Sequence, residues 1–131
     1  MTNYIEIKRQ DNGLFNFLKP DGTLVSKEWF RYTWAYCEGF IRVQREDDRF
    51  NFLKSDGTFL SEEWFEQARN FCEGFAKVQR KDFSFNFLKP DGTFLSEEWF
   101  KQAWTSCEGF ARVQRKDGSW WSLNKDGTLT E

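Results

Sequence analysis

Residues 86–120 read NFLKPDGTFLSEEWFKQAWTSCEGFARVQRKDGSW, and residues 51–85 repeat this stretch with only 8 differences in 35 positions. Residues 16–50 match residues 51–85 at 20 positions in the same register. Residues 1–15 match the end of a copy, and residues 121–131 begin another. Self-similarity at one constant period is typical of tandem repeats, whose units bury their apolar faces against each other. We therefore interpret the whole chain as a single repeat domain with three full copies and two partial ones.

Each copy carries the pattern of short antiparallel strands. Apolar and polar residues alternate in ARVQ (111–114), and this period of two predicts a half-buried strand. The FNFL segments predict a second strand, and a tight turn separates the two. A second turn of the KPDGT type follows, in which Pro, Asp and Gly suit successive corners. We therefore expect three short strands per copy.

The stretch SEEWFEQARNFCEG (61–74) changes period and predicts a short helix. Ser61 can cap a helix, the two glutamates favour its N-terminus, and apolar residues follow at helical spacing. Gly74 would lie near the C-terminal end. In the first copy the equivalent residues 31–36 read RYTWAY, which is β-prone, so an irregular turn stays an alternative.

The expected fold class is all-β, mostly β with short helical turns, over residues 1–131. The 35-residue repeats of short antiparallel strands are expected to stack as an open solenoid-like array, because a closed propeller-like ring needs more blades than three and a fraction. The C-terminal KDGTLTE suits a polar cap.

Composition argues against most enzyme chemistry. The chain has no histidine, which removes the commonest general base and metal ligand. An enzyme would need one unrepeated polar constellation, and the repeats offer none. We predict no catalytic residue, no metal site and no cofactor. With 19 basic against 21 acidic residues, the net charge of −2 gives no global attraction to nucleic acid or to an anionic membrane.

The sequence predicts a cytoplasmic, monomeric protein. No run approaches the length of a membrane span, and the charged N-terminus lacks the apolar region of a signal peptide. The 3 cysteines, evenly spaced at positions 37, 72 and 107, do not form a disulfide framework. We interpret them as small buried packing residues, with a metal shared between stacked thiols as the alternative.

The repeat resembles the WG β-repeat (WG-containing repeat) family of bacterial and phage proteins. The likeness rests on CEGF at 37–40, 72–75 and 107–110, on the turn glycines and on the EWF triplets. This chain has Phe-Asn or Trp-Trp where the family has its Trp-Gly pair. The resemblance implies a tandem β-rich architecture that binds rather than catalyses.

Repetition separates packing residues from candidate binding residues. Trp29, Trp64 and Trp99 recur with the period and are expected in the core between repeats, with a stacking platform for bases or sugars as the alternative. Two basic ladders also recur, and they are either paired internally or bind an anionic partner. The ladders are Arg42, Lys77, Arg112 and Arg45, Arg80, Arg115.

Positions at which the copies differ are candidates for partner choice, since packing demands are shared and unique residues are not. The largest differences fall at residues 31–36 and their equivalents, where Trp34, Arg69 and Trp104 correspond, and at the hairpin tip that holds Phe83. The alternative is drift on a surface under no selection. The sequence predicts a non-enzymatic repeat module that binds another protein. The alternative is a small phage or mobile-element inhibitor that binds a nucleic-acid enzyme, or nucleic acid itself, through the basic ladders.

Overall fold

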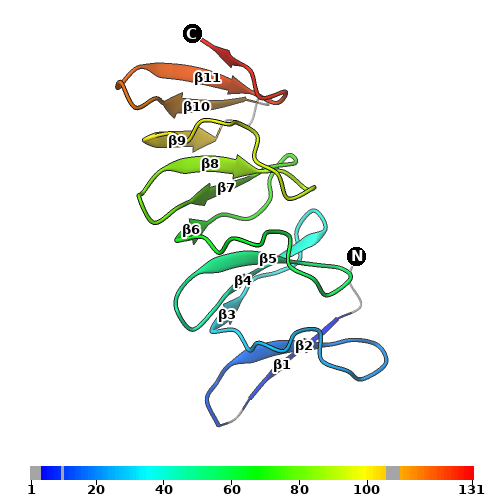
Figure 1. Ribbon diagram of the computed structural model, residues 1–131. Helices are drawn as coiled ribbons and strands as arrows, with labels where there is room; N and C mark the ends of the chain where they lie inside the picture. Colours follow the sequence, from blue (N-terminus) through cyan, green and yellow to red (C-terminus); the bar gives the residue numbers. More distant parts are fainter. Residues whose placement is uncertain (1–3, 10, 106–109) are drawn as a thin grey trace. The chain divides into compact units, whose positions relative to one another are not determined.

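The computed structural model describes residues 4–9, 11–105 and 110–131, and within these ranges it has twelve short strands and no helix (Figure 1). The all-β class is therefore confirmed. The chain divides into two compact units, residues 1–64 and residues 65–131. The described residues include no helix of the length and apolarity that crossing a membrane requires.

The first unit contains a hairpin and a three-stranded sheet, both antiparallel. Strands β1 (Ile5–Lys8) and β2 (Phe15–Leu18) form the hairpin. Strands β3 (Tyr32–Thr33), β4 (Phe40–Gln44) and β5 (Phe50–Lys54) form the sheet in that order, so that β3 is an edge strand. Pairing between sequence neighbours needs only short connections, as the turn signals predict.

The second unit repeats the three-stranded sheet and adds a four-stranded one. Strands β6 (Gln67–Ala68), β7 (Ala76–Gln79) and β8 (Phe85–Leu88) form the first sheet in chain order. The second sheet has the order β12-β11-β10-β9, and β9 lies between β8 and β10 in Figure 1. Its strands are β9 (Gln102–Thr105), β10 (Phe110–Gln114), β11 (Trp120–Asn124) and β12 (Leu129–Thr130).

The predicted helix is wrong, because the SEEWF segments are extended and bent. The Ser61 hydroxyl accepts a hydrogen bond from the backbone N–H of Glu63 at 3.0 Å. A serine that caps a helix makes a similar bond, but here the bond closes a short turn. In the first copy the chain then pairs with β2, as Phe15 and Phe30 exchange two backbone hydrogen bonds of 2.7 Å. Helical geometry would break this pairing.

The CEGF segments at 37–40 and 72–75 are tight hairpin turns, so the prediction that Gly74 ends a helix is also wrong. Cys37 and Phe40 exchange backbone hydrogen bonds of 2.8 and 3.1 Å. The φ angles are 52° at Glu38 and 99° at Gly39, and positive values at both corners define a type I′ turn. This turn places residues 32–33 and 67–68 as the edge strands of the two three-stranded sheets.

The third strand expected after the DGT turns forms only at β12. In the full copies, the residue two positions after each turn glycine makes a single bridge to the preceding strand, as Leu53 does with Phe59. The chain then leaves that sheet to reach the next one, which explains why the ladder stops after one bridge.

The cysteine interpretation fails at the described positions. Cys72 is exposed and Cys37 is half-buried, because both open a hairpin turn at the surface. Cys107 lies outside the described residues.

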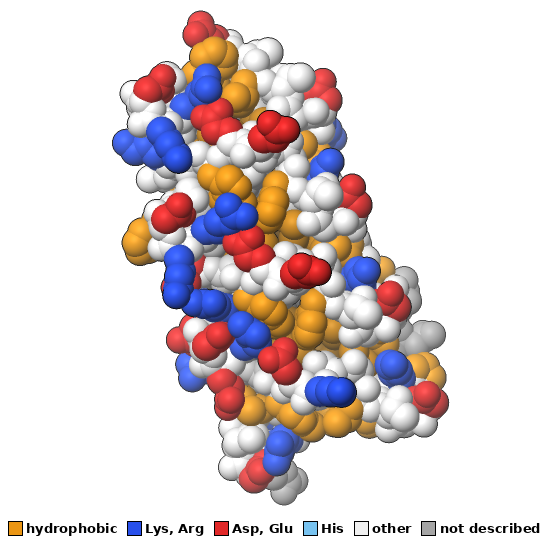
Figure 2. All heavy atoms as spheres, in the orientation of Figure 1, with side chains coloured by type: hydrophobic (Ala, Val, Ile, Leu, Met, Phe, Trp, Pro, Cys, Tyr) orange, Lys and Arg blue, Asp and Glu red, His pale blue; other side chains and the backbone are white. Residues whose placement is uncertain are grey.

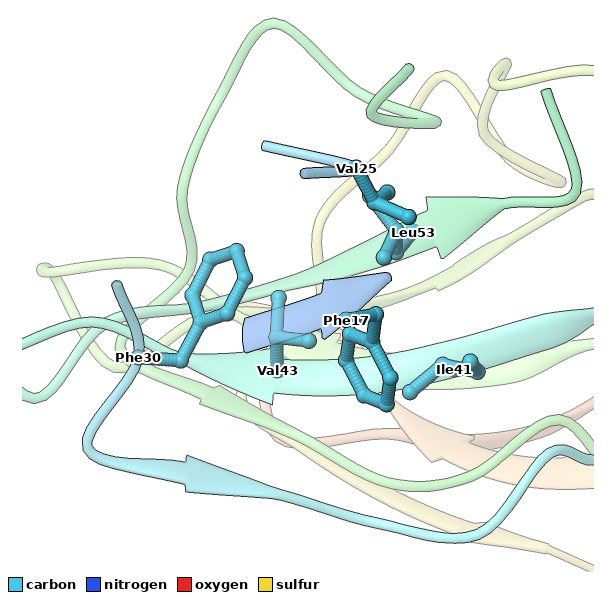
Figure 3. Packing of buried hydrophobic residues seen from close by; sticks show 6 residues of the cluster. All are labelled: Phe17, Val25, Phe30, Ile41, Val43 and Leu53. Carbon is cyan, nitrogen blue, oxygen red and sulfur yellow. The ribbon is translucent and has the colours of Figure 1, made fainter. Parts of the chain in front are cut away.

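Each unit has a core built from inward-facing strand residues and the phenylalanine of EWF. Figure 3 shows Phe17 of β2 pointing toward Ile41 and Val43 of β4. The core of the first unit consists of Phe17, Val25, Phe30, Ile41, Val43 and Leu53. The core of the second unit contains Phe87, Phe100, Ala103, Ala111, Val113 and Leu123. Phe30, Phe65 and Phe100 are completely buried.

A buried asparagine in each FNFL strand holds the following bent segment in place. The Asn51 amide donates to the carbonyl of Ser61 at 2.8 Å, and its oxygen accepts the N–H of Phe52 at 2.7 Å. Asn16 and Asn86 make the same contacts in their copies, and none of the three is exposed. Because amide groups rather than helix bonds satisfy this backbone, the segment can stay extended.

Candidate binding surface

One face of the four-stranded sheet is open and carries two exposed tryptophans. We call it the tryptophan face. Cross-strand neighbours point to the same side of a sheet, so the register defines two rows of side chains. The rows are Trp104, Arg112, Ser122, Thr130 and Gln102, Gln114, Trp120. The exposed fraction is 63% for Trp104 and 38% for Trp120.

The equivalent face of the neighbouring sheet is closed by a phenylalanine. Phe87 of β8 is 3% exposed and packs with Ala103, Ala111 and Val113 of the four-stranded sheet. Phe17 and Phe52 precede it at the same spacing and are also buried. Ser122 stands at this position in β11, where it lies 3.5 Å from a guanidinium nitrogen of Arg112. The tryptophan face therefore lacks the side chain with which the other copies bury this surface.

The tryptophan face has one cation and no carboxylate among its seven residues. Aromatic rings and a guanidinium supply apolar area, while serine, threonine and glutamine supply hydrogen-bonding groups. Such a mixture of flat apolar area and neutral polar groups suits the binding of another macromolecule.

The structure brings together two groups of residues that the sequence predicted separately. In each copy the variable residue lies in the edge strand or directly after it, beside the basic residue on the next strand. The Arg42 guanidinium lies 4.1 Å from the centre of the Trp34 ring. Trp104 lies directly opposite Arg112, and the Arg69 N–H donates to the Lys77 carbonyl at 2.9 Å.

The second basic ladder makes contacts inside its own unit. The Arg45 guanidinium lies 4.0 Å from the Trp64 ring centre and 3.1 Å from the Asp47 carboxylate. Arg80 lies 3.8 Å from the Trp99 ring centre. These tryptophans are half-buried, so the tryptophan of EWF stacks on an arginine at the margin of the core while its phenylalanine neighbour fills the core.

Arg115 completes this ladder with a carboxylate. Its side chain contacts Glu98 at 2.8 Å and lies 5.2 Å from the Trp121 ring centre. The hydrogen bond that Arg115 donates to the Glu98 carboxylate is the main cause that raises the pKa of Arg115. In Figure 2, basic and acidic side chains are interspersed over the displayed surface. The internal contacts of this ladder match the paired alternative left open by the sequence.

Phe83 lies alone at the tip of the β7–β8 hairpin. Its side chain is 69% exposed, and its φ angle of 67° is in the left-handed region that favours glycine. Asp48 and Gly118 occupy the equivalent positions with φ angles of 69° and 89°. The tip is therefore the same turn in all three copies, and Phe83 is the only large apolar residue among them.

Sequence reasoning missed Trp120 and the buried asparagines. Trp120 replaces the phenylalanine of FNFL, and Ser122 replaces the next phenylalanine of the same strand. These two departures from the repeated sequence were the signal in the sequence that marks this face. A polar residue repeated inside FNFL was the corresponding signal for the asparagines.

Neither a family model nor a curated protein matches the sequence. Solved structures match over nearly the whole chain at low identity. Hsv2 of Kluyvelomyces marxianus is 14% identical over 98% of this chain and 47% of its own, with a TM-score of 0.49. The computationally designed Ika8 protein is 12% identical over 100% of this chain and 46% of its own, with a TM-score of 0.46.

The WD40 beta propeller domain of Doa1 is 11% identical over 96% of this chain and 52% of its own, with a TM-score of 0.40. The chain thus spans about half the length of each of these structures. All three TM-scores are below 0.5.

Proposed function

We propose that the chain is a non-enzymatic repeat module that binds another protein through the tryptophan face. The observation that carries the proposal is the exposure of Trp104 and Trp120 on either side of Arg112, on a face that the other copies close with phenylalanine. Tryptophan and arginine are the residues most enriched among binding hot spots.

The second candidate is an inhibitor that binds nucleic acid or a nucleic-acid enzyme. Exposed tryptophans can stack on unpaired bases, which favours single-stranded nucleic acid over a duplex. Against it, the Arg45, Arg80 and Arg115 ladder is engaged with tryptophans and carboxylates. Only Arg112 supplies charge to the tryptophan face. Binding of a labelled oligothymidine that weakens steeply with salt would favour this candidate.

The proposal includes four expectations that the sequence supports. They are open solenoid-like stacking of the repeats, a monomeric state, a cytoplasmic location and membership of the WG β-repeat family. Small-angle scattering tests the first, since an open array gives an elongated particle and a closed ring a compact one.

The decisive experiment compares proteins captured from a lysate of the source organism. The baits are the wild type, the Trp104→Ala/Trp120→Ala double variant and a Tyr32→Ala control. Tyr32 is 54% exposed but lies on β3, which belongs to a different sheet from the one that carries the tryptophan face. We expect a protein retained by the wild type and the control and lost by the double variant. Equal capture by all three baits would overturn the proposal.

A further inference from the structure

The middle copy places two cations where its sister copies place a cation beside a tryptophan. Trp34 and Trp104 lie next to Arg42 and Arg112, and a ring face attracts a guanidinium. Arg69 occupies the equivalent position beside Lys77. The favourable pair is thus replaced by a like-charge pair, which destabilises neighbouring strands unless an anion compensates.

Within the part of the chain that the structure describes, no carboxylate compensates the charge of this pair. The Lys77 ammonium donates to the carbonyl of Ala103 at 3.2 Å and lies 5.3 Å from the Phe85 ring centre. No carboxylate among residues 4–9, 11–105 and 110–131 lies within ion-pair distance, 4.0 Å, of either cation. Arg69 is exposed, so an anion can reach the pair from solvent.

The electrostatics of Lys77 agree with this geometry. Burial is the larger cause and the Arg69 charge the smaller cause that lower the pKa of Lys77 from its ordinary value. An anion bound between the two side chains would favour the charged ammonium and raise that pKa again.

We infer that Arg69 and Lys77 form an anion site that binds a carboxylate of the partner protein. The inference rests on the proposed function for the nature of the partner. Ala103, which accepts the Lys77 hydrogen bond, is adjacent to Trp104 in edge strand β9. A partner segment crossing this edge can therefore place an apolar side chain on Trp104 and an acidic one between the cations. The guanidinium offers a bidentate fork and the ammonium a second point of contact.

The test is a titration of isotope-labelled protein with a capped hexaglutamate peptide at low ionic strength, followed by NMR of the lysine and arginine side chains. We expect saturable shifts at Arg69 and Lys77 and a rise in the Lys77 pKa. Arg69→Gln should bind about tenfold more weakly, as expected for loss of a charged hydrogen bond. Arg69→Trp, which restores the residue of the sister copies, should do the same without harm to the fold.

Lys116→Gln is the matched control, because it removes the same charge from an exposed side chain outside the pair. Equal weakening by the control, or unchanged binding by Arg69→Gln, would overturn the site. Tighter binding of inorganic phosphate than of the peptide at these side chains would overturn the carboxylate assignment.

The peptide titration tests the anion site and the lysate capture tests the proposed function, so the failure of one can be told from the failure of the other. Peptide binding without dependence of capture on Trp104 and Trp120 would leave the anion site and remove the proposed function. Capture that depends on the tryptophans, without peptide binding, would leave the proposed function and remove the anion site.

Discussion

The buried asparagines show how one side chain determines the course of the chain. Each amide group joins a strand to the bent segment that begins about ten residues later, as Asn51 does with Ser61. The period could predict that these asparagines matter but not what they contact, because their partners are backbone carbonyls of a segment whose pattern indicated a helix.

We expect Asn51→Ala to lower the free energy of unfolding by about 2 kcal/mol, because it leaves buried backbone groups without a partner. Urea denaturation followed by tryptophan fluorescence measures the change. Asn70→Ala is the control, since Asn70 is exposed, and it should change stability little. A loss no larger than that of the control would show that the amide contacts do not hold the segment.

The tip position of the hairpins gives a second prediction at this scale. Phe83→Gly should stabilise the protein by about 1 kcal/mol, because glycine adopts a positive φ without strain. Gly118→Ala should have the opposite sign, and crowding does not contribute because nothing lies within 4 Å of the added Cβ. Thermal unfolding of both variants checks the pair. If both variants changed the stability in the same direction, the explanation by backbone strain at the tip position would be contradicted.

At the scale of elements, strands were predictable and connections were not. Strands β4 and β5 follow from the period of two and from FNFL, since their burial depends on local pattern. The SEEWF segments failed because a serine followed by glutamates serves a short turn as well as a helix. The CEGF turn was missed because Glu38 is not a usual residue for a positive φ.

The DGT turns predict how stability depends on pH. The Thr58 hydroxyl and backbone N–H donate to Asp56, and the hydroxyl bond is the main cause that lowers the pKa of this carboxyl. Asp21, Asp91 and Asp126 are lowered in the same way. A carboxyl whose pKa is lower in the folded state stabilises the fold above its unfolded pKa, and this contribution is lost as pH falls.

We therefore expect the free energy of unfolding to stay level between about pH 5.5 and 8 and to fall below about pH 4. The level range follows because the chain contains 0 histidines. Urea denaturation at five pH values across this span checks both parts. A drop between pH 8 and 5.5 would contradict the assignment of pH dependence to these carboxyls.

At the scale of the molecule, the repeat was predictable and its departures proved the more informative. The 35-residue register predicted repeated small sheets and their cores. It did not predict which face stays open. On that face Ser122 stands at the position of a phenylalanine that is buried in the other copies. The variable residues Trp34, Arg69 and Trp104 were found from sequence, but their basic neighbours became meaningful only with the strand register.

Restoring that phenylalanine should change how the protein behaves in solution. We expect Ser122→Phe to self-associate as concentration rises, because it adds to the tryptophan face the side chain that packs on another sheet in the preceding copy. Sedimentation velocity of the wild type, Ser122→Phe and a Ser122→Thr control measures this. A monomeric Ser122→Phe at all concentrations would show that this position does not determine whether the face stays open.

The most direct measurement is the affinity of the captured partner for the tryptophan face, determined by isothermal titration calorimetry with purified proteins. The account predicts that Trp104→Ala/Trp120→Ala weakens binding by at least about 100-fold, as for the loss of two hot-spot tryptophans, while Tyr32→Ala binds like the wild type. Affinities of the double variant and the wild type that agree within about twofold would contradict it.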